Sequence, residues 1–384
     1  MVMPLPTLRL SIIFLLVVLF APLTSTSHAD NLPFRVSSSA AVLGDIDSGA
    51  ILYSHDAETR RPPASLTKVM TLFNIYEALE KGDLDLETKL PVSEKAWRMG
   101  GSKTFVRVGD MVRVEDLIRG IAVQSGNDAC IVVAEHLGGT EKGFADLMNT
   151  KARELGMYNS HFMNASGLPD DDHYSTAYDI FRLARTVIAR FPQFGHYTRE
   201  KQYTYNGIRQ YNRNKLLWRD PSITGLKTGH TRAAGYCLIA TNDHEGQRMS
   251  AVIMGASSSK VREEEALRLL RYGNRMYETL HLYSGNTPIK EFRVWKGNKE
   301  NITGMIREDL LVTIPRKERS NLEVGLSYKD PLIAPIAPGD QIGTLVVKIG
   351  DKEVVSRPVI ANSGIDQAGF VGSFIDSARL RMGW

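Results

Sequence analysis

Residues 41–53 contain short apolar runs separated by turn residues, and residues 65–82 have apolar residues at helical spacing. Residues 41–43 and 51–53 are apolar and flank Asp47-Ser48-Gly49, which is the pattern of a β-hairpin. From Ser65 onward, apolar residues recur every three or four positions as far as Gly82. This spacing predicts an amphipathic helix that begins at Ser65 and ends at the glycine.

Helical spacing continues through the middle of the chain and then gives way to strands. Apolar residues lie at helical intervals over residues 114–137 and 144–155, which predicts an all-helical middle stretch. Two apolar runs, 236–240 and 249–254, flank a polar turn and predict an antiparallel hairpin. Helical spacing returns over residues 263–280. This order favours the α+β class, with helices packed on an antiparallel sheet.

After Pro288 the pattern changes to short alternating runs with turn residues between them, at residues 292–295, 310–314, 322–326 and 344–349. We therefore expect two domains, one over residues 30–288 and a small all-β domain over residues 289–363. The small domain contains no cluster of residues suited to catalysis.

The last stretch, residues 364–384, has apolar residues on one helical face: Phe370, Val371, Phe374, Ile375, Ala378 and Met382. One interpretation is a terminal helix packed on the β domain. The other is a membrane anchor that lies in the lipid interface. We favour the anchor, because the apolar strip is rich in aromatic residues, ends in Trp384 and has arginines beside it.

The amino-terminal residues 1–29 have the pattern of a secretory signal peptide. Arg9 precedes an apolar block over residues 10–23, and small residues follow at 27–29. A membrane-spanning anchor is the alternative, but the block is shorter than the ~20 residues that a span needs. Both interpretations place the body outside the cytoplasm, and we expect the mature chain to begin near Asp30.

Composition and charge narrow the class of protein. The chain is 43% hydrophobic and 23% charged, which is typical of a soluble globular protein. A net charge of +4 is too weak to indicate nucleic-acid binding, although it suits a negatively charged membrane or cell wall. Only two cysteines are present, Cys130 and Cys237; we expect buried free thiols, with a disulfide as the alternative.

Three short motifs carry the candidate chemistry, and their order matters more than any one of them. Ser65-Leu66-Thr67-Lys68 comes first, Ser125-Gly126-Asn127 second and Lys227-Thr228-Gly229 third, which matches serine acyl-enzymes acting on D-alanyl peptides or β-lactams. Residues 257–260 also fit the first pattern, and residues 284–286 fit the second. Their context marks them as decoys, because residues 257–260 lie in a serine cluster and residues 284–286 come after the lysine motif, just before Pro288.

Ser65 and Lys68 are the candidate nucleophile and base. A serine hydroxyl needs a base within hydrogen-bond reach, and residues three apart at the start of a helix project on one face. Lys68 can act as a base only if its pKa falls far below ~10.4, through burial or a neighbouring cation. In isolation, a helix-capping serine and a solvated lysine would be the simpler interpretation. The other two motifs favour catalysis.

The second motif offers a hydroxyl and an amide. Ser125 is suited to relaying a proton to a leaving amine, and Asn127 to holding Ser65, Lys68 or a substrate carbonyl. A turn that caps the following helix is the alternative, and it is compatible with the catalytic role.

The third motif resembles an edge-strand segment with a lysine. Lys227 could supply the second cation, and Thr228 could bind a carboxylate. Gly229 would let a peptide approach the backbone, and the N–H of His230 would be an oxyanion donor together with that of Ser65. A lysine-bearing turn would explain this motif if it stood alone.

The motifs, with residues 225–231 and 234–236 around them, resemble the low-molecular-mass penicillin-binding proteins that are D-alanyl-D-alanine carboxypeptidases. The resemblance extends to residues 212–218, the small β domain and the amphipathic tail. It implies a penicillin-binding or β-lactamase-like transpeptidase domain, with an antiparallel sheet and a helical subdomain, followed by a small β-sandwich. It also assigns the nucleophile, base, relay serine and third-motif lysine to Ser65, Lys68, Ser125 and Lys227.

The same resemblance implies the substrate and partners. The substrate would be a peptidoglycan stem peptide, whose terminal carboxylate Arg213 and Arg262 would hold, although both also read as ordinary surface arginines. β-Lactams would be covalent inhibitors, and the tail would contact the periplasmic side of the cytoplasmic membrane. Whether the chain forms a homodimer stays open. We expect no metal or organic cofactor, because the sequence has no ligand-spaced His/Cys/Asp cluster and no phosphate-binding loop.

Three rival functions remain to be weighed. A β-lactamase needs a residue that activates the deacylating water, and Glu154 lacks the expected spacing to Asn159. A disabled cell-wall binding protein is disfavoured, because all the catalytic side chains are present. Transpeptidase or endopeptidase action uses the same chemistry and depends on the shape of the site.

Overall fold

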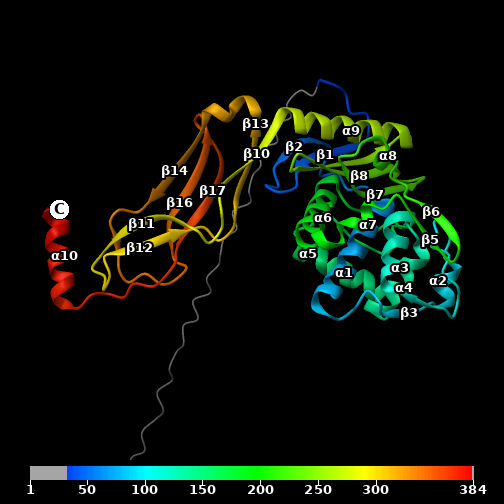
Figure 1. The fold of residues 1–384 in the computed structure, drawn as a ribbon, viewed down its shortest axis with the longest axis horizontal. Helices are drawn as coiled ribbons and strands as arrows, with labels where there is room; N and C mark the ends of the chain where they lie inside the picture. Colours follow the sequence, from blue (N-terminus) through cyan, green and yellow to red (C-terminus); the bar gives the residue numbers. More distant parts are fainter. Residues whose placement is uncertain (1–32, 383–384) are drawn as a thin grey trace, which may run out of the picture.

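The computed structural model describes residues 33–382, so the signal peptide expected over residues 1–29 and the terminal Trp384 lie outside the described range. A large α+β body and a smaller β part lie side by side, and the chain passes between them along β10 (Tyr277–Tyr283) (Figure 1).

A five-stranded antiparallel sheet forms the centre of the body, in the order β2-β1-β9-β8-β7. Its strands are β1 (Ala40–Asp45), β2 (Ile51–His55), β7 (Ile223–Thr231), β8 (Gly235–His244) and β9 (Gln247–Ala256). The two predicted hairpins are therefore confirmed. Successive side chains point to opposite faces, so Val42 and Leu43 belong to two different hydrophobic cores. Both faces are covered, which explains why these strands are apolar throughout.

Helices cover the two faces of this sheet unequally (Figure 1). On one face lies α9 (Ser259–Met276), packed on β8 and β9. On the other lies α6 (Ala177–Arg190), with the helical subdomain beyond it. The remaining body helices are α1 (Lys68–Lys81), α2 (Glu94–Arg98), α3 (Val114–Arg119), α4 (Asn127–Gly138), α5 (Glu141–Glu154), α7 (Gly195–Arg199) and α8 (Leu216–Arg219), with single turns η1 (Ala64–Thr67), η2 (Gly120–Gln124) and η3 (Pro192–Phe194).

Two helix predictions need correction. The helix expected over residues 114–137 is broken, because α3 passes into the π-helical turn η2 and then into Ser125, whose φ is 66°. The helix expected over residues 263–280 ends at Met276, where β10 begins and pairs with β13. Both errors have one cause: contacts distant in sequence override the local helical spacing.

Two short ribbons flank the helical subdomain. β3 (Lys89–Pro91) pairs with β4 (Met111–Arg113), and β5 (Gln202–Tyr205) pairs with β6 (Ile208–Tyr211).

The β part consists of the ribbon β10–β13 and a six-stranded sheet in the order β14-β16-β17-β12-β11-β15. Its strands after β10 are β11 (Pro288–Trp295), β12 (Asn301–Met305), β13 (Leu310–Pro315), β14 (Leu322–Tyr328), β15 (Leu332–Ile333), β16 (Gln341–Ile349) and β17 (Lys352–Ala361), with the turn η4 (Arg316–Asn321). Ribbon and sheet share one apolar core that includes Val312 and Val347. Residue 289, the expected start of the small domain, falls after β10, which already pairs with this part.

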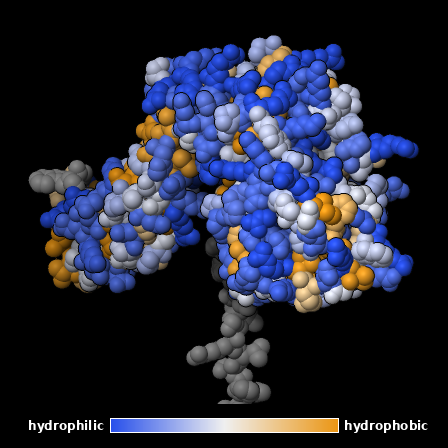
Figure 2. Space-filling view, turned by 45° about the vertical axis from the view of Figure 1, so that its right-hand side comes forward, coloured by the Kyte–Doolittle hydropathy of each residue, from blue (hydrophilic) through white to orange (hydrophobic). Residues whose placement is uncertain are grey.

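The chain ends in α10 (Phe370–Met382), at the far end of the β part from the body (Figure 1). A hydrogen bond ties it back to the β part, since the Asp376 carboxylate accepts the backbone N–H of Lys296 at 2.7 Å. Apolar side chains gather at this end of the molecule (Figure 2). Among the described residues, no helix has the length and hydrophobicity to span a membrane.

Candidate active site

Ser65 lies in the turn η1, immediately before α1. The turn packs closely against β7, because a Cβ built on Gly229 would lie 3.1 Å from the backbone nitrogen of Ser65. A side chain at this position would have to push the turn away by a few tenths of an ångström, so glycine suits this close approach. The turn is closed by its own hydrogen bonds, because the N–H of Leu66 donates to the Pro63 carbonyl at 3.2 Å and the N–H of Lys68 donates back into the turn.

Lys68 lies one turn after the serine and is fully buried. Its Nζ donates hydrogen bonds to Ser65 Oγ at 3.0 Å, to Asn127 Oδ1 at 2.7 Å and to the carbonyl oxygen of Ser166 at 2.6 Å. Burial lowers the pKa of Lys68 to about 8, because the charged ammonium loses hydration. The lysine is thus held beside the serine, and it loses a proton more easily than an exposed lysine does.

The second motif follows the π-helical turn η2, and such turns occur often at functional sites. Ser125 has a left-handed backbone with φ 66°, and its hydroxyl is buried without a hydrogen-bond partner in the described part of the chain. Asn127 is tied down on both sides of its amide, since its Nδ2 donates to the Gly100 carbonyl at 2.7 Å while its Oδ1 accepts from Lys68. The strained turn therefore leaves one hydroxyl free to act on a ligand.

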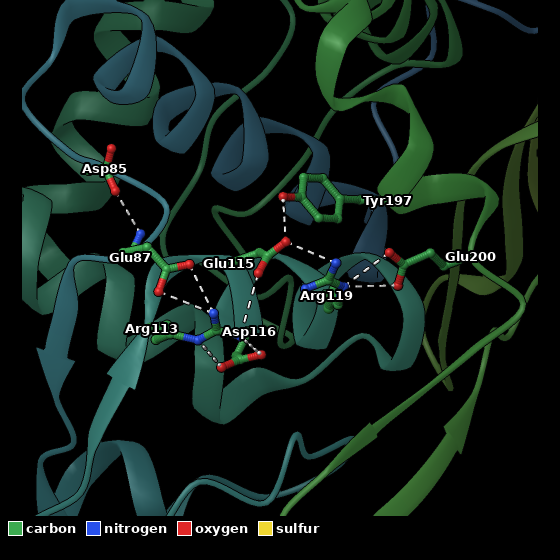
Figure 3. A network of polar contacts seen from close by, with 8 residues as sticks. All are labelled: Asp85, Glu87, Arg113, Glu115, Asp116, Arg119, Tyr197 and Glu200. Carbon is green, nitrogen blue, oxygen red and sulfur yellow. Dashed lines mark hydrogen bonds and ion pairs between the residues drawn. The ribbon is translucent and has the colours of Figure 1, made fainter.

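A polar network fixes the helix that leads into this turn (Figure 3). Arg119, near the end of α3, forms ion pairs with Glu115 at 2.9 Å and with Glu200 at 3.0 Å. Tyr197 on α7 donates to the same Glu115 carboxylate. The network extends along the β3–β4 ribbon through Asp85, Glu87, Arg113 and Asp116. It holds α3 against α7, and so fixes where η2 begins.

Lys227 of the third motif is 2% exposed, and its Nζ donates to the Thr228 carbonyl at 2.9 Å. Burial, with a further contribution from the charge of Lys68, lowers the pKa of Lys227 well below its usual range. Two buried lysines therefore face the same small volume, which disfavours charging both.

A cavity of about 390 Å³ opens in front of these groups. Its wall includes seven of the ten residues expected from the sequence, namely Ser65, Ser125, Arg213, Thr228, Gly229, His230 and Arg262. The other three, Lys68, Asn127 and Lys227, are buried behind that wall. The structure thus brings all ten residues together.

The two arginines differ in their surroundings. Arg262 is 6% exposed; its guanidinium donates to the carbonyls of Gly229 at 3.2 Å and Cys237 at 3.3 Å, while its Nε is buried without a partner in the described residues. Arg213 is exposed and donates to the Gln124 carbonyl at 3.0 Å. Arg262 is therefore no ordinary surface arginine. Its positive charge lines the cavity.

Sequence reasoning missed four contributors to the site. Ser102, Lys215 and Tyr236 line the cavity, and Ser166 supplies a carbonyl to Lys68. A backbone carbonyl carries no side-chain signal, so no motif could have identified Ser166. Tyr236 lies in the segment that carries the family resemblance, and its ring centroid lies 4.0 Å from that of His230, with the two rings tilted by 31°.

The decoy motifs lie elsewhere. Ser257 and Lys260 flank the start of α9, where Lys260 is 82% exposed, and residues 284–286 form an exposed turn after β10. Both cysteines are buried and unpaired, as predicted, and burial raises the pKa of each thiol to about 11. Within residues 33–382, no group of three or more metal-ligating side chains is found.

A serine hydroxyl within hydrogen-bond distance of a buried lysine is an arrangement that suits ester formation with carbonyl substrates. Fold and site together define the class of serine acyl-enzymes, built on an antiparallel sheet with a helical subdomain. Comparison with known proteins narrows that class.

Residues 24–258 match the family described as D-alanyl-D-alanine carboxypeptidase, and residues 277–367 match the C-terminal domain of penicillin-binding protein 5. The carboxypeptidase DacC of Escherichia coli K12 is 34% identical over 371 residues, covering 94% of this chain and 93% of its own. DacF of Bacillus subtilis is 36% identical, covering 86% and 87%.

Solved structures agree with these matches. Penicillin-binding protein 5 of Haemophilus influenzae superposes with a TM-score of 0.85 at 34% identity, covering 88% of this chain and 99% of its own. Penicillin-binding protein D2 of Listeria monocytogenes, in its ampicillin-bound form, gives a TM-score of 0.58 at 30% identity, covering 63% and 100%. The chain belongs to the family of serine-type D-alanyl-D-alanine carboxypeptidases, the penicillin-binding proteins that act on peptidoglycan.

Proposed function

We propose that Ser65 is the acylated residue and that neutral Lys68 is its base. The observation that carries this assignment is the 3.0 Å contact between Ser65 Oγ and the Nζ of the buried Lys68. The hydroxyl oxygen attacks the carbonyl carbon between the last two D-alanines of a stem peptide. Its proton passes to Lys68, and the carbonyl oxygen becomes an oxyanion bound by the backbone N–H groups of Ser65 and His230.

Collapse of this intermediate breaks the peptide bond. The leaving D-alanine nitrogen takes a proton that Ser125 relays from the lysines, and Ser65 keeps the acyl group as an ester. Water then adds to the ester carbonyl, and the acyl chain leaves as a carboxylic acid while Ser65 regains its proton. In this scheme Lys227 keeps the field around Ser125 positive and Asn127 holds Lys68 in place.

Specificity for a chain terminus comes from the cationic end of the cavity. Arg262 and Arg213 face the cavity together with the hydroxyl-bearing Thr228. A terminal carboxylate would be paired there with two guanidinium groups, which bind carboxylates well. This feature favours carboxypeptidase action over endopeptidase or transpeptidase action.

β-Lactams should acylate the same serine, since they present a strained amide to the same donors. The ampicillin-bound form of the Listeria relative supports this assignment. The β-lactamase alternative is less well supported, because Glu154 pairs with Lys151 at 2.8 Å and does not line the cavity.

The working location is the periplasmic side of the cytoplasmic membrane, with α10 lying in the lipid interface. Phe370 is 89% and Phe374 68% exposed, so these rings contribute little to the β part and are free for lipid. Arg379 and Arg381 at the helix end suit anionic headgroups.

Mass spectrometry of a stem pentapeptide incubated with the protein tests the reaction. Loss of one D-alanine is the expected result. A cross-linked product would indicate transpeptidation instead, and an unchanged peptide would contradict the proposal.

A further inference from the structure

The loop between α2 and β4 forms part of the cavity wall through Ser102, and it contains no regular secondary structure over residues 102–107. A loop without such structure needs other partners for its backbone N–H groups. The backbone of Phe105 is also strained, with φ 71° although the residue has a side chain. Something outside the loop must hold it in this form.

The partner is the carboxylate of Asp128, the residue next to Asn127. Asp128 Oδ1 accepts the N–H of Thr104 at 2.8 Å, and Oδ2 accepts those of Phe105 at 2.8 Å and Val106 at 3.3 Å. Asp128 is 1% exposed, and no Lys or Arg of the described residues forms an ion pair with it. Three consecutive loop amides thus meet a single buried carboxylate.

Helix capping alone does not explain this arrangement. Asp128 lies in the first turn of α4, where a negative charge is favourable, and it also accepts the N–H of the adjacent Ala129 at 2.9 Å. Capping requires no contact with a loop more than twenty residues away, and an exposed carboxylate would serve it equally well. Asn127 adds a further tie, since its backbone N–H donates to the Ser102 carbonyl at 2.7 Å.

We propose that Asp128 is a positioning residue for acylation, which holds residues 102–106 as a fixed wall of the cavity and places a negative charge behind Lys68. This inference rests on the proposed function of Ser65 and Lys68. It goes beyond that function because Asp128 does not line the cavity and acts through its neighbours.

The charge gives the proposal a distinct signature. Burial is the main cause of the lowered pKa of Lys68; Cys130 and Asp128 oppose it, and Arg213 adds to it. Lys227, buried beside Lys68, is the remaining cation. Removing the charge of Asp128 therefore lowers the pKa of Lys68 further. In a plot of acylation rate against pH, the acid limb is the range in which the rate rises as Lys68 loses its proton. This limb should move to lower pH.

The experiment compares Asp128→Asn with Gln210→Met in the full mature chain, using acylation by a labelled penicillin across pH. Gln210 Nε2 donates to the Thr104 carbonyl at 3.0 Å, so the control loosens the same loop without changing any charge. For Asp128→Asn we expect at least a tenfold loss of acylation rate at saturating pH and an acid limb shifted to lower pH. Gln210→Met should leave the limb in place. An unmoved limb and an unchanged rate in Asp128→Asn would overturn the proposal.

A second measurement covers the case in which Asp128→Asn does not fold. Hydrogen exchange on the wild-type protein should show the amides of Thr104, Phe105 and Val106 protected as strongly as those of β8. Exchange at the rate of exposed loops would overturn the proposal. This readout needs no activity, whereas absence of wild-type acylation would contradict only the proposed function.

Discussion

The α+β body and the β part bury very different side chains. The body encloses Lys68, Asp128, Lys227 and Arg262, each at most 6% exposed. In the described residues after Met276, the buried polar side chains are Glu278 and Thr313, and both lie on the ribbon that joins the two parts. The core of the β part is otherwise apolar.

Backbone strain and unpaired buried polar atoms also differ between the body and the β part. Ala64, Phe105 and Ser125 have positive φ around the cavity, and every buried side-chain atom without a partner in the described residues belongs to the body. In the β part, residues other than glycine with positive φ are Asn286 and Lys296, both in turns. Buried charge and strain reduce stability, so a fold retains them where chemistry depends on them. The difference teaches that the features chemistry requires, buried charge and a strained backbone, are concentrated in the body.

The largest effect should come from Lys68→Arg. Arginine keeps the charge but does not release a proton near neutral pH, so the base is lost. We expect acylation by a labelled penicillin to slow by roughly 10²- to 10⁴-fold, the usual size of general-base catalysis. Circular dichroism should confirm a folded protein. Acylation at nearly the normal rate in a folded variant would show that the buried charge serves structure and not chemistry.

The acylation rate of the wild-type protein should change about tenfold per pH unit below the pKa of Lys68. Because the base must be neutral and the pKa of Lys68 is about 8, acylation should rise with pH up to that value and level off above it. Acylation rates measured from pH 5 to 10 on the wild-type protein test this. A rise in acylation rate centred near the ordinary lysine pKa of ~10.4 would mean that burial does not lower the pKa of Lys68.

Matched core substitutions in the two parts should separate stability from catalysis. Leu345→Ala in the β part and Leu238→Ala in β8 remove buried leucines, and each should cost about 2–5 kcal/mol of unfolding free energy. Leu238 pairs with Thr228 of the third motif, so only that variant should also slow acylation per folded molecule. Denaturant titration and acylation rates check both values. Equal losses of rate would remove the distinction between the two parts.

Truncation before α10 should have the smallest effect on the reaction. A chain ending at Ser363 loses the exposed rings of Phe370 and Phe374 but no residue of the cavity. This shortened protein should no longer bind membrane vesicles, and it should hydrolyse a soluble D-alanyl-D-alanine peptide at the rate of the full-length protein. Sedimentation with vesicles and D-alanine release measure these outcomes. Loss of turnover would instead show that α10 supports the fold of the enzyme.

The sequence pattern predicted the elements whose formation depends on neighbouring residues in the chain. The helix after Ser65 and the hairpin of β8 and β9 follow from spacing and turn residues alone. The turn at Ser125 and the strand β10 could not be predicted, because both depend on partners far away in sequence.

The site shows the same limit. The three motifs and the residue after the third located eight of the ten residues around the cavity, and the family resemblance supplied the other two, Arg213 and Arg262. Two contacts could not be predicted, because each joins residues far apart in the sequence. They are the hydrogen bond from Lys68 to the Ser166 carbonyl and the hydrogen bond from the Phe105 N–H to the Asp128 carboxylate.

The most direct test of where the chemistry lies is to label the protein with a penicillin and identify the acylated residue by peptide mass spectrometry. The account predicts a label on Ser65, lost in Ser65→Ala and retained in the matched decoy variant Ser257→Ala. A label on Ser257, or labelling that survives Ser65→Ala, would contradict it.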